Sequence, residues 1–263
     1  KKIENLKLQI NKKKDYKDKL KFCNKVSQLP SKIYISIIST NSKERLKALE
    51  NITKYIKTKF IIFEKVLFPK IDNYFLAKKI LKKKRIKSWV HMPLPDFPFF
   101  KFIINKLRKE KKFKIIIKGP EGNLGCNSIH YLGIFKNIIN KSQFSVDTSK
   151  LDKLIIKSKR KGYIEFNGKI IFSTLDKKKF LFIDYSDKGK KNYFRAEIFF
   201  KNFKIIYNEI SGQCKIFNYK NKLLIKEKNF KVPFISNTTQ QYVKQIIKSN
   251  NCKLPSFDNA AIL

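Results

Sequence analysis

The sequence predicts an α/β protein in which a doubly wound parallel sheet is followed by an α+β part with a mostly antiparallel, open sheet. Two observations support this fold class. In residues 1–118, short β-branched and aromatic runs alternate with segments of helical length, which is typical of parallel sheets. From Gly162 onward, short strands with alternating polarity dominate instead. We therefore predict two domains, residues 1–118 and residues 119–263.

The first strand is predicted at Ile33–Ser39, which is rich in β-branched residues. Asn41 follows it, with Glu44 three residues later, a pattern typical of a helix N-cap. A helix is therefore expected over about Lys43–Lys57. The same alternation predicts the rest of this part: strand Phe60–Phe63, helix Asn73–Lys83, strand Ser88–His91, helix Phe99–Lys109 and strand Phe113–Lys118.

The second part is expected to begin with a helix at Ser128–Asn140 and to end with a helix at Thr238–Ser249. Between them, Asn167-Gly168 is a dipeptide favoured in tight hairpin turns, so the strands on either side of it should pair. The predicted strands are Tyr163–Phe166, Lys169–Ser173, Phe180–Tyr185, Tyr193–Phe200, Phe203–Ile210 and Lys215–Tyr219.

The net charge of +41 would ordinarily indicate a nucleic-acid or anionic-membrane partner. Lysine, however, makes up nearly all of the 61 basic residues. Surfaces that clamp phosphate or read bases favour arginine for its planar fork. Because Lys, Ile, Asn and Phe are all abundant, as A/T-rich codons would give, composition is the preferred explanation of the charge, with a basic binding surface as the alternative.

The four cysteines are widely spaced without a CxxC pair, and the chain has only two histidines, so neither a zinc site nor a disulfide framework is indicated. A reduced, cytoplasmic compartment fits this pattern. No apolar run approaches the roughly 18 residues of a membrane span. The chain starts at Lys1 and its only methionine is Met92, so we expect a fragment or a processed product.

Three segments contain candidate catalytic chemistry. Glu64-Lys65 ends a short apolar strand, which places Lys65 at the carboxyl edge of a parallel sheet, where open α/β proteins bind ligands. Cys126-Asn127-Ser128-Ile129-His130 opens a helix, and Ser158–Phe166 is a basic stretch that ends in Glu165-Phe166. Taken singly, each has an ordinary structural explanation: a solvated strand end, a helix cap or a small buried side chain.

Taken in this order and spacing, the segments resemble the glucose-fructose oxidoreductase/inositol dehydrogenase (Gfo/Idh/MocA) family. The resemblance runs from about Ile33 to the C-terminus, in a branch associated with surface-glycan sugars. Glu64-Lys65 looks like the Glu-Lys-Pro signature with Val66 in place of proline, and Cys126 to His130 looks like the Asp-x-x-x-His motif. The stretch 159–166 and Pro233–Thr239 match the same branch.

The resemblance implies an NAD(P)-dependent oxidoreductase, with a partial Rossmann-type dinucleotide-binding domain, that acts on a sugar or nucleotide-sugar hydroxyl or ketone. Lys65 and His130 would be its catalytic residues, with His130 as the base and Lys65 bound to the reacting oxygen. NAD or NADP would be the cofactor and the protein a homo-oligomer, with no metal. The implied cofactor contacts are Thr40, Asn41, Glu64 and Asn127.

The sequence departs from the family pattern in several places. Cys126 stands where the motif has an acid, Gly133 where an Asp often follows the histidine, and Leu94-Pro95 where the branch has arginines. No GxGxxG loop follows a strand anywhere in the chain, although that loop normally cradles the cofactor pyrophosphate. We therefore expect truncation, with residues 1–30 as the tail of an earlier βα unit and a linker.

Two alternatives from other functional classes stay open. The chain could be a degenerate, non-catalytic family member, or a basic protein that binds RNA through lysines. The scarcity of arginine and the lack of an aromatic-basic recognition motif weigh against the second.

Overall fold

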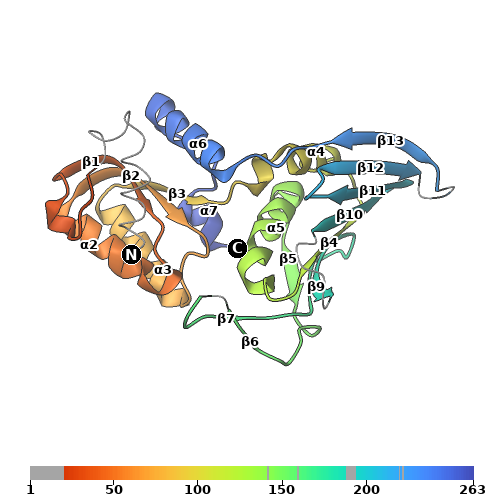
Figure 1. Ribbon diagram of the computed structural model, residues 1–263, viewed down its shortest axis with the longest axis horizontal. Coiled ribbons are helices and arrows are strands. Elements are labelled where there is room, and N and C mark those ends of the chain that lie inside the picture. The colour runs from red at the N-terminus through yellow and green to blue at the C-terminus, as the bar shows by residue number, and fades with distance from the viewer. Residues whose placement is uncertain (1–20, 141, 159, 188–193, 219, 221) are drawn as a thin grey trace.

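The computed structural model describes residues 21–263, apart from positions 141, 159, 188–193, 219 and 221 (Figure 1). The described chain is an α/β protein with one small parallel sheet and one larger, mostly antiparallel sheet, which confirms the predicted fold class. The expected βα tail at residues 1–30 lies largely outside the described residues. Its described end contains only a short 3-10 helix, η2 (Val26–Gln28).

The small sheet has three parallel strands in the order β1-β2-β3. These strands alternate with two helices that pack on one of its faces, burying Ile61 and Phe63 among helix side chains such as Leu49 and Ala77. The βαβαβ alternation is that of one mononucleotide-binding half of a Rossmann-type fold. The element bounds are β1 (Lys32–Ile38), α2 (Ser42–Tyr55), β2 (Lys57–Glu64), α3 (Ile71–Lys83) and β3 (Lys87–His91).

The opposite face of the small sheet is covered by the closing helix α6 (Ile235–Ser249), in which Tyr242 and Ile246 pack against Phe60 and Trp89. The chain thus returns from the large sheet to the small one, as Figure 1 shows for the blue C-terminal helices. A short helix, α7 (Phe257–Ala261), then packs beside β3.

The large sheet has eight strands in the order β13-β12-β11-β10-β4-β9-β8-β5, and only the β4–β9 pair is parallel. Helices α4 (Pro98–Leu107) and α5 (Leu124–Ile139) pack over one face. The strand bounds are β4 (Phe113–Pro120), β5 (Phe144–Asp147), β8 (Lys169–Thr174), β9 (Lys179–Asp187), β10 (Arg195–Phe200), β11 (Phe203–Asn208), β12 (Gln213–Asn218) and β13 (Leu224–Asn229).

Two sequence-based assignments are wrong. The Phe113–Lys118 strand does not extend the parallel sheet, because β4 pairs with β9 and β10. The predicted division into domains 1–118 and 119–263 stays a prediction. The Asn167-Gly168 hairpin does not form either. Strand β7 (Ile164–Glu165) pairs instead with β6 (Ile156–Lys157), in a separate two-stranded sheet. Both errors concern pairing partners, which local pattern does not encode. The predicted strand ends at Tyr193 and Tyr219 lie outside the described residues.

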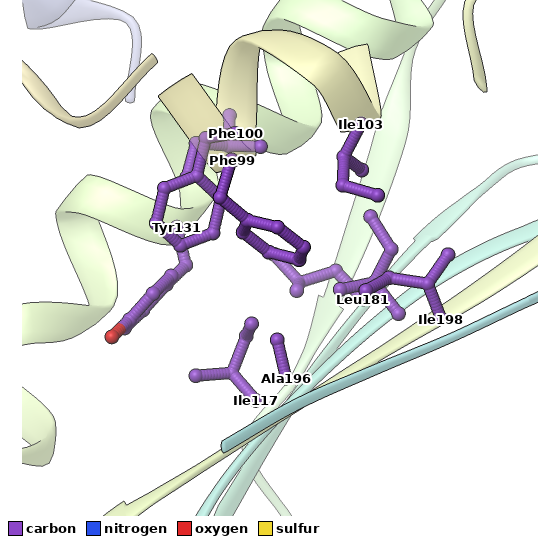
Figure 2. A pocket seen from close by; sticks show the side chains of 10 residues that line it. Phe99, Phe100, Ile103, Ile117, Tyr131, Leu181, Ala196 and Ile198 are labelled. Atoms are coloured by element: carbon purple, nitrogen blue, oxygen red, sulfur yellow. The ribbon is translucent and has the colours of Figure 1, made fainter. Parts of the chain in front are cut away.

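The interior between α4, α5 and the large sheet is tightly packed. Figure 2 shows a cavity there, with Phe99, Phe100 and Ile103 of α4 facing Leu181 and other sheet side chains. It measures about 10 Å³, roughly the smallest space that holds one water. This cavity is a packing feature of the core, too small for a cofactor or a sugar.

No helix among the described residues is both long and apolar enough to cross a membrane.

Candidate active site at the carboxyl edge of the parallel sheet

The loops that follow β1 and β2 are held together by one buried arginine. Arg45 of α2 donates hydrogen bonds to the carbonyl oxygens of Val66, of Leu67 at 2.8 Å, and of Thr40. Since parallel strands end at the same edge of their sheet, this side chain fixes the spacing between the Thr40-Asn41 loop and the Lys65-Val66 loop. The peptide bond between Lys65 and Val66 is cis.

Lys65 connects this edge to the first turn of α5. Its Nζ donates to the carbonyl oxygen of Cys126 at 2.6 Å and lies 3.3 Å from the Cys126 Sγ. An ammonium group has three donors, so one remains for another acceptor. The two candidate segments that the sequence analysis singled out therefore meet, although 61 residues separate them.

Glu64 faces the end of the neighbouring strand. Its Oε2 lies 3.5 Å from Nδ1 of His91, and Nε2 of His91 lies 3.0 Å from the hydroxyl of Thr239 in α6. Burial acts to raise the pKa of Glu64, but the hydrogen bond to His91 and the charges of His91 and Lys65 outweigh it, so the pKa lies below its ordinary value. Glu64 is thus a carboxylate at neutral pH, beside the Lys65 ammonium.

His130 lies one turn further along α5, where the charges of this cluster shift its pKa. Burial, followed by the positive charge of Lys65, lowers the pKa of His130 from 6.5 to about 3. The imidazole is therefore neutral at pH 7. Its Nδ1 is buried and has no hydrogen-bond partner among the described residues. A buried nitrogen without a partner is costly to a protein, and a bound ligand is one way to satisfy it.

Asn127 lies between this cluster and the large sheet, where its side chain acts on the phenol of Tyr185. Burial raises the pKa of Tyr185, and contacts with Tyr131 and Asn127 oppose that shift. The ring of Tyr185 lies against Gly119 of β4, where an added Cβ would come within 2.4 Å of it. Asn127 therefore lies beside Tyr185 of the large sheet.

The site also receives a carboxylate from the β6–β7 hairpin. Oε2 of Glu165 accepts hydrogen bonds from the backbone amides of Gly125 at 2.8 Å and Cys126 at 3.3 Å. These are two of the amides that a helix N-terminus leaves without an internal partner. Burial raises the pKa of Glu165, while the amide bonds and the charge of Lys65 oppose the shift.

The structure thus brings Glu64, Lys65 and His130 into one cluster. Thr40 and Asn41 lie in the adjacent loop, both exposed, where Asn41 is the N-cap residue of α2 by position but makes no side-chain cap bond. Their predicted role at a cofactor stays a prediction.

Sequence reasoning missed one residue of this cluster, His91, and named another, Glu165, without giving it a role. His91 ends β3 just as Lys65 follows the end of β2, so the rule that drew attention to Lys65 applied to it as well. Glu165 was named only as part of the Ser158–Phe166 stretch, because local pattern does not show that it accepts from amides 39 and 40 residues away.

A large groove of the described surface lies elsewhere. It measures about 730 Å³, between α4, α5 and the C-terminal segment, and is lined by residues such as Arg108, Lys136 and Lys253. Neither Lys65 nor His130 lines it. Among the described residues, no group of three or more His, Cys, Asp or Glu side chains could hold a metal ion.

No protein-family profile matches the sequence, and no curated protein sequence matches it. Solved structures do resemble the fold. A dehydrogenase, MviM, from Clostridium difficile aligns with TM-score 0.70 at 13% identity, covering 97% of this chain and 84% of that one. UDP-N-acetylglucosamine 3-dehydrogenase GnnA from Acidithiobacillus ferrooxidans aligns with TM-score 0.69 at 8% identity, covering 92% and 79%.

A third similar structure is levoglucosan dehydrogenase in complex with NADH and levoglucosan, with TM-score 0.62 at 13% identity, covering 87% of this chain and 75% of that one. At these identities the likeness concerns the backbone fold. The chain therefore has the Rossmann-like α/β fold of these oxidoreductases, with its cluster of charged residues at the carboxyl edge of the parallel sheet.

Proposed function

We propose that the protein is an NAD(P)-dependent oxidoreductase that acts on a hydroxyl or ketone group of a sugar or nucleotide-sugar in surface-glycan metabolism. The observation that carries the proposal is a lysine ammonium, Lys65, whose charge acts on a neutral histidine with an unpartnered buried nitrogen, His130. Both lie where open α/β folds bind their ligands. The names of the similar structures support an oxidoreductase with a sugar-type substrate.

The described residues fit the reactive end of a nicotinamide cofactor. The unpartnered Nδ1 of His130 indicates a ligand at this point, and Arg45 holds the two adjacent loops at a fixed spacing. Asn127, Glu64 and the Thr40-Asn41 loop would hold the cofactor. When bound, the nicotinamide supplies hydride transfer.

The protein's own residues would accept the proton and stabilise the negative charge that develops on the substrate oxygen. Nδ1 of His130 would accept the hydroxyl proton in the neutral tautomer that carries its proton on Nε2. The remaining donor of Lys65 would bind the substrate oxygen as negative charge develops on it. Glu64 balances the charge of Lys65 and stays ionised because its pKa is lowered.

We also propose that the open face of the large sheet mediates homo-oligomer formation. The face opposite α4 and α5 carries apolar side chains that are only half-buried, among them Ile116, Phe180, Phe182 and Phe199. The rings of Phe180 and Phe182 stack with centroids 5.9 Å apart. A second copy of the chain would remove this apolar surface from water.

Trp89, the only tryptophan, makes a direct test of cofactor binding feasible. It lies buried in β3 of the small sheet, so energy transfer from Trp89 to NADH or NADPH should be saturable, and Trp89→Phe should abolish the signal. Turnover is then measured with a panel of UDP-sugars by the change in nicotinamide absorbance.

Lys65→Ala should lower turnover by on the order of 10²–10³-fold, the usual effect of removing one oxyanion-stabilising donor. Lys59→Ala is the matched control, because Lys59 is an exposed lysine of β2, the strand that Lys65 follows. Unchanged turnover in Lys65→Ala, or the absence of saturable binding of either nucleotide, would overturn the proposal.

A further inference from the structure

We propose that Glu165 is a positioning residue that holds the Lys65 side chain in the site by acting through the first turn of α5. The expected effect of Glu165 on turnover rests on the proposed function, whereas its effect on the position of Lys65 does not. Glu165 belongs to the β6–β7 hairpin, which forms a two-stranded sheet apart from both main sheets, and it reaches the site from there.

Glu165 and Lys65 act on the same residue from two sides. Glu165 accepts the amide hydrogen of Cys126, and Lys65 donates to the Cys126 carbonyl at 2.6 Å. Glu165 also bonds the amide of Gly125, where an added Cβ would lie 3.0 Å from its Oε2. The carboxylate and the ammonium are therefore linked through one peptide segment whose position both determine.

Electrostatics explains why a carboxylate is needed at this point. The N-terminus of a helix carries a partial positive charge, which favours anions and disfavours cations. Lys65 nevertheless places an ammonium beside the first turn of α5. Glu165, 6% exposed, supplies a negative charge at the same helix end, and Lys65 acts in turn on the pKa of Glu165. Without that charge, the amides of α5 and the lysine would repel each other.

The same hairpin is anchored at its other end to the small sheet. Nζ of Lys43, in the first turn of α2, donates to the carbonyl oxygen of Gly162 at 2.5 Å, and the Lys43 amide donates to the hydroxyl of Tyr163 at 3.3 Å. The segment 162–165 therefore spans from the start of α2 to the start of α5. These two contacts help to hold in place the hairpin that carries the Glu165 carboxylate.

The test measures how accessible the Lys65 amine is in the full chain. Reductive methylation with formaldehyde, followed by peptide mass spectrometry, gives the labelling rate of Lys65 relative to that of Lys59, an exposed lysine of β2. Glu165→Gln retains an acceptor oxygen and loses the charge, whereas Glu165→Ala loses both. Glu110→Gln is the matched control, because Glu110 is another mostly buried carboxylate, paired with Lys201 at 3.0 Å.

Glu165→Ala should raise the relative labelling rate of Lys65 by roughly tenfold, corresponding to about 1.4 kcal/mol of lost hydrogen bonding. Glu165→Gln should raise it by less, and Glu110→Gln should leave it unchanged. A role in stability alone would lower the melting temperature of Glu165→Gln without changing the Lys65 to Lys59 ratio, and that result would overturn the proposal.

The two proposals fail in different ways. If wild type turns over UDP-sugars, Glu165→Gln should lower kcat and leave the KM for the nucleotide unchanged, because Glu165 acts through the amides of α5. Altered labelling of Lys65 in a protein without turnover would refute the proposed function and support the positioning. Normal turnover and normal labelling in a folded Glu165→Gln variant would refute the positioning alone.

Discussion

The guanidinium of Arg45 and the carbonyl oxygen of Leu67 are joined by a buried hydrogen bond of 2.8 Å. The same side chain, 2% exposed, also bonds the carbonyls of Val66 and Thr40. A single helix residue thus connects the loops at the ends of two parallel strands. The position of Lys65 depends on this loop, because Arg45 bonds the carbonyls of the two residues that follow it.

Replacing this arginine should destabilise the protein. Arg45→Met leaves buried carbonyl oxygens without a donor, and we expect a loss of about 3 kcal/mol in the free energy of unfolding, measured with urea. Arg85→Met is the control: Arg85 is exposed, so a change within about 0.5 kcal/mol is expected. Equal stability of the two variants would show that Arg45 does not hold the loops.

The stability of the protein should depend on pH through His130. The folded-state pKa is about 3 and the ordinary value is 6.5, so the unfolded chain binds this proton more readily. Above pH 6.5, His130 is neutral in both the folded and the unfolded chain and does not reduce stability. As the pH drops from 6.5 toward 3, the unfolded chain binds the proton and the free energy of unfolding falls. Urea unfolding at pH 7 and at pH 5 should show a smaller loss in His130→Gln than in wild type.

The chain has only two histidines, so an NMR titration should resolve both imidazoles. The His130 signals should stay those of a neutral ring across pH 7 to 5. A His130 ring that titrates near pH 6.5 would contradict the burial seen here.

Gly119 leaves no room for a side chain beside Tyr185. Gly119→Ala would place a Cβ 2.4 Å from the Tyr185 ring, and we expect a loss of about 1–3 kcal/mol in the free energy of unfolding. Tyr185→Leu in the same chain should recover part of that loss, because the shorter side chain removes the clash. Gly133→Ala is the control, since its Cβ would meet the flexible end of Met92 at 3.0 Å and lie in ordinary contact with Leu263 at 4.0 Å.

Salt distinguishes the oxidoreductase from a lysine-based RNA-binding protein. Binding driven by phosphate contacts weakens steeply between low and moderate salt, because it releases counterions. We expect association with a generic single-stranded RNA to disappear over that range, while energy transfer from Trp89 to NADH persists. RNA binding that survives moderate salt, together with no NADH signal, would favour the binding protein.

Local pattern predicted most elements of the fold. The run Ile33–Ser39 and the helix signals after Asn41 correspond closely to β1 and α2, because such segments are encoded by their own residues. Pairing is not encoded in that way. Strand β4 has the same apolar character as a parallel-sheet strand, and only β9 and β10, far along the chain, decide its sheet.

The sequence by itself determined that Lys65 stands at the end of a buried strand and that His130 lies in the first turns of a helix. The tertiary structure decided that these two segments meet, that Glu165 reaches α5 from a remote hairpin, and that His130 is buried enough to be neutral. The reason is physical. Strand and helix propensities act over a few residues, whereas burial, charge and the partners of a backbone amide depend on groups brought together by the whole fold.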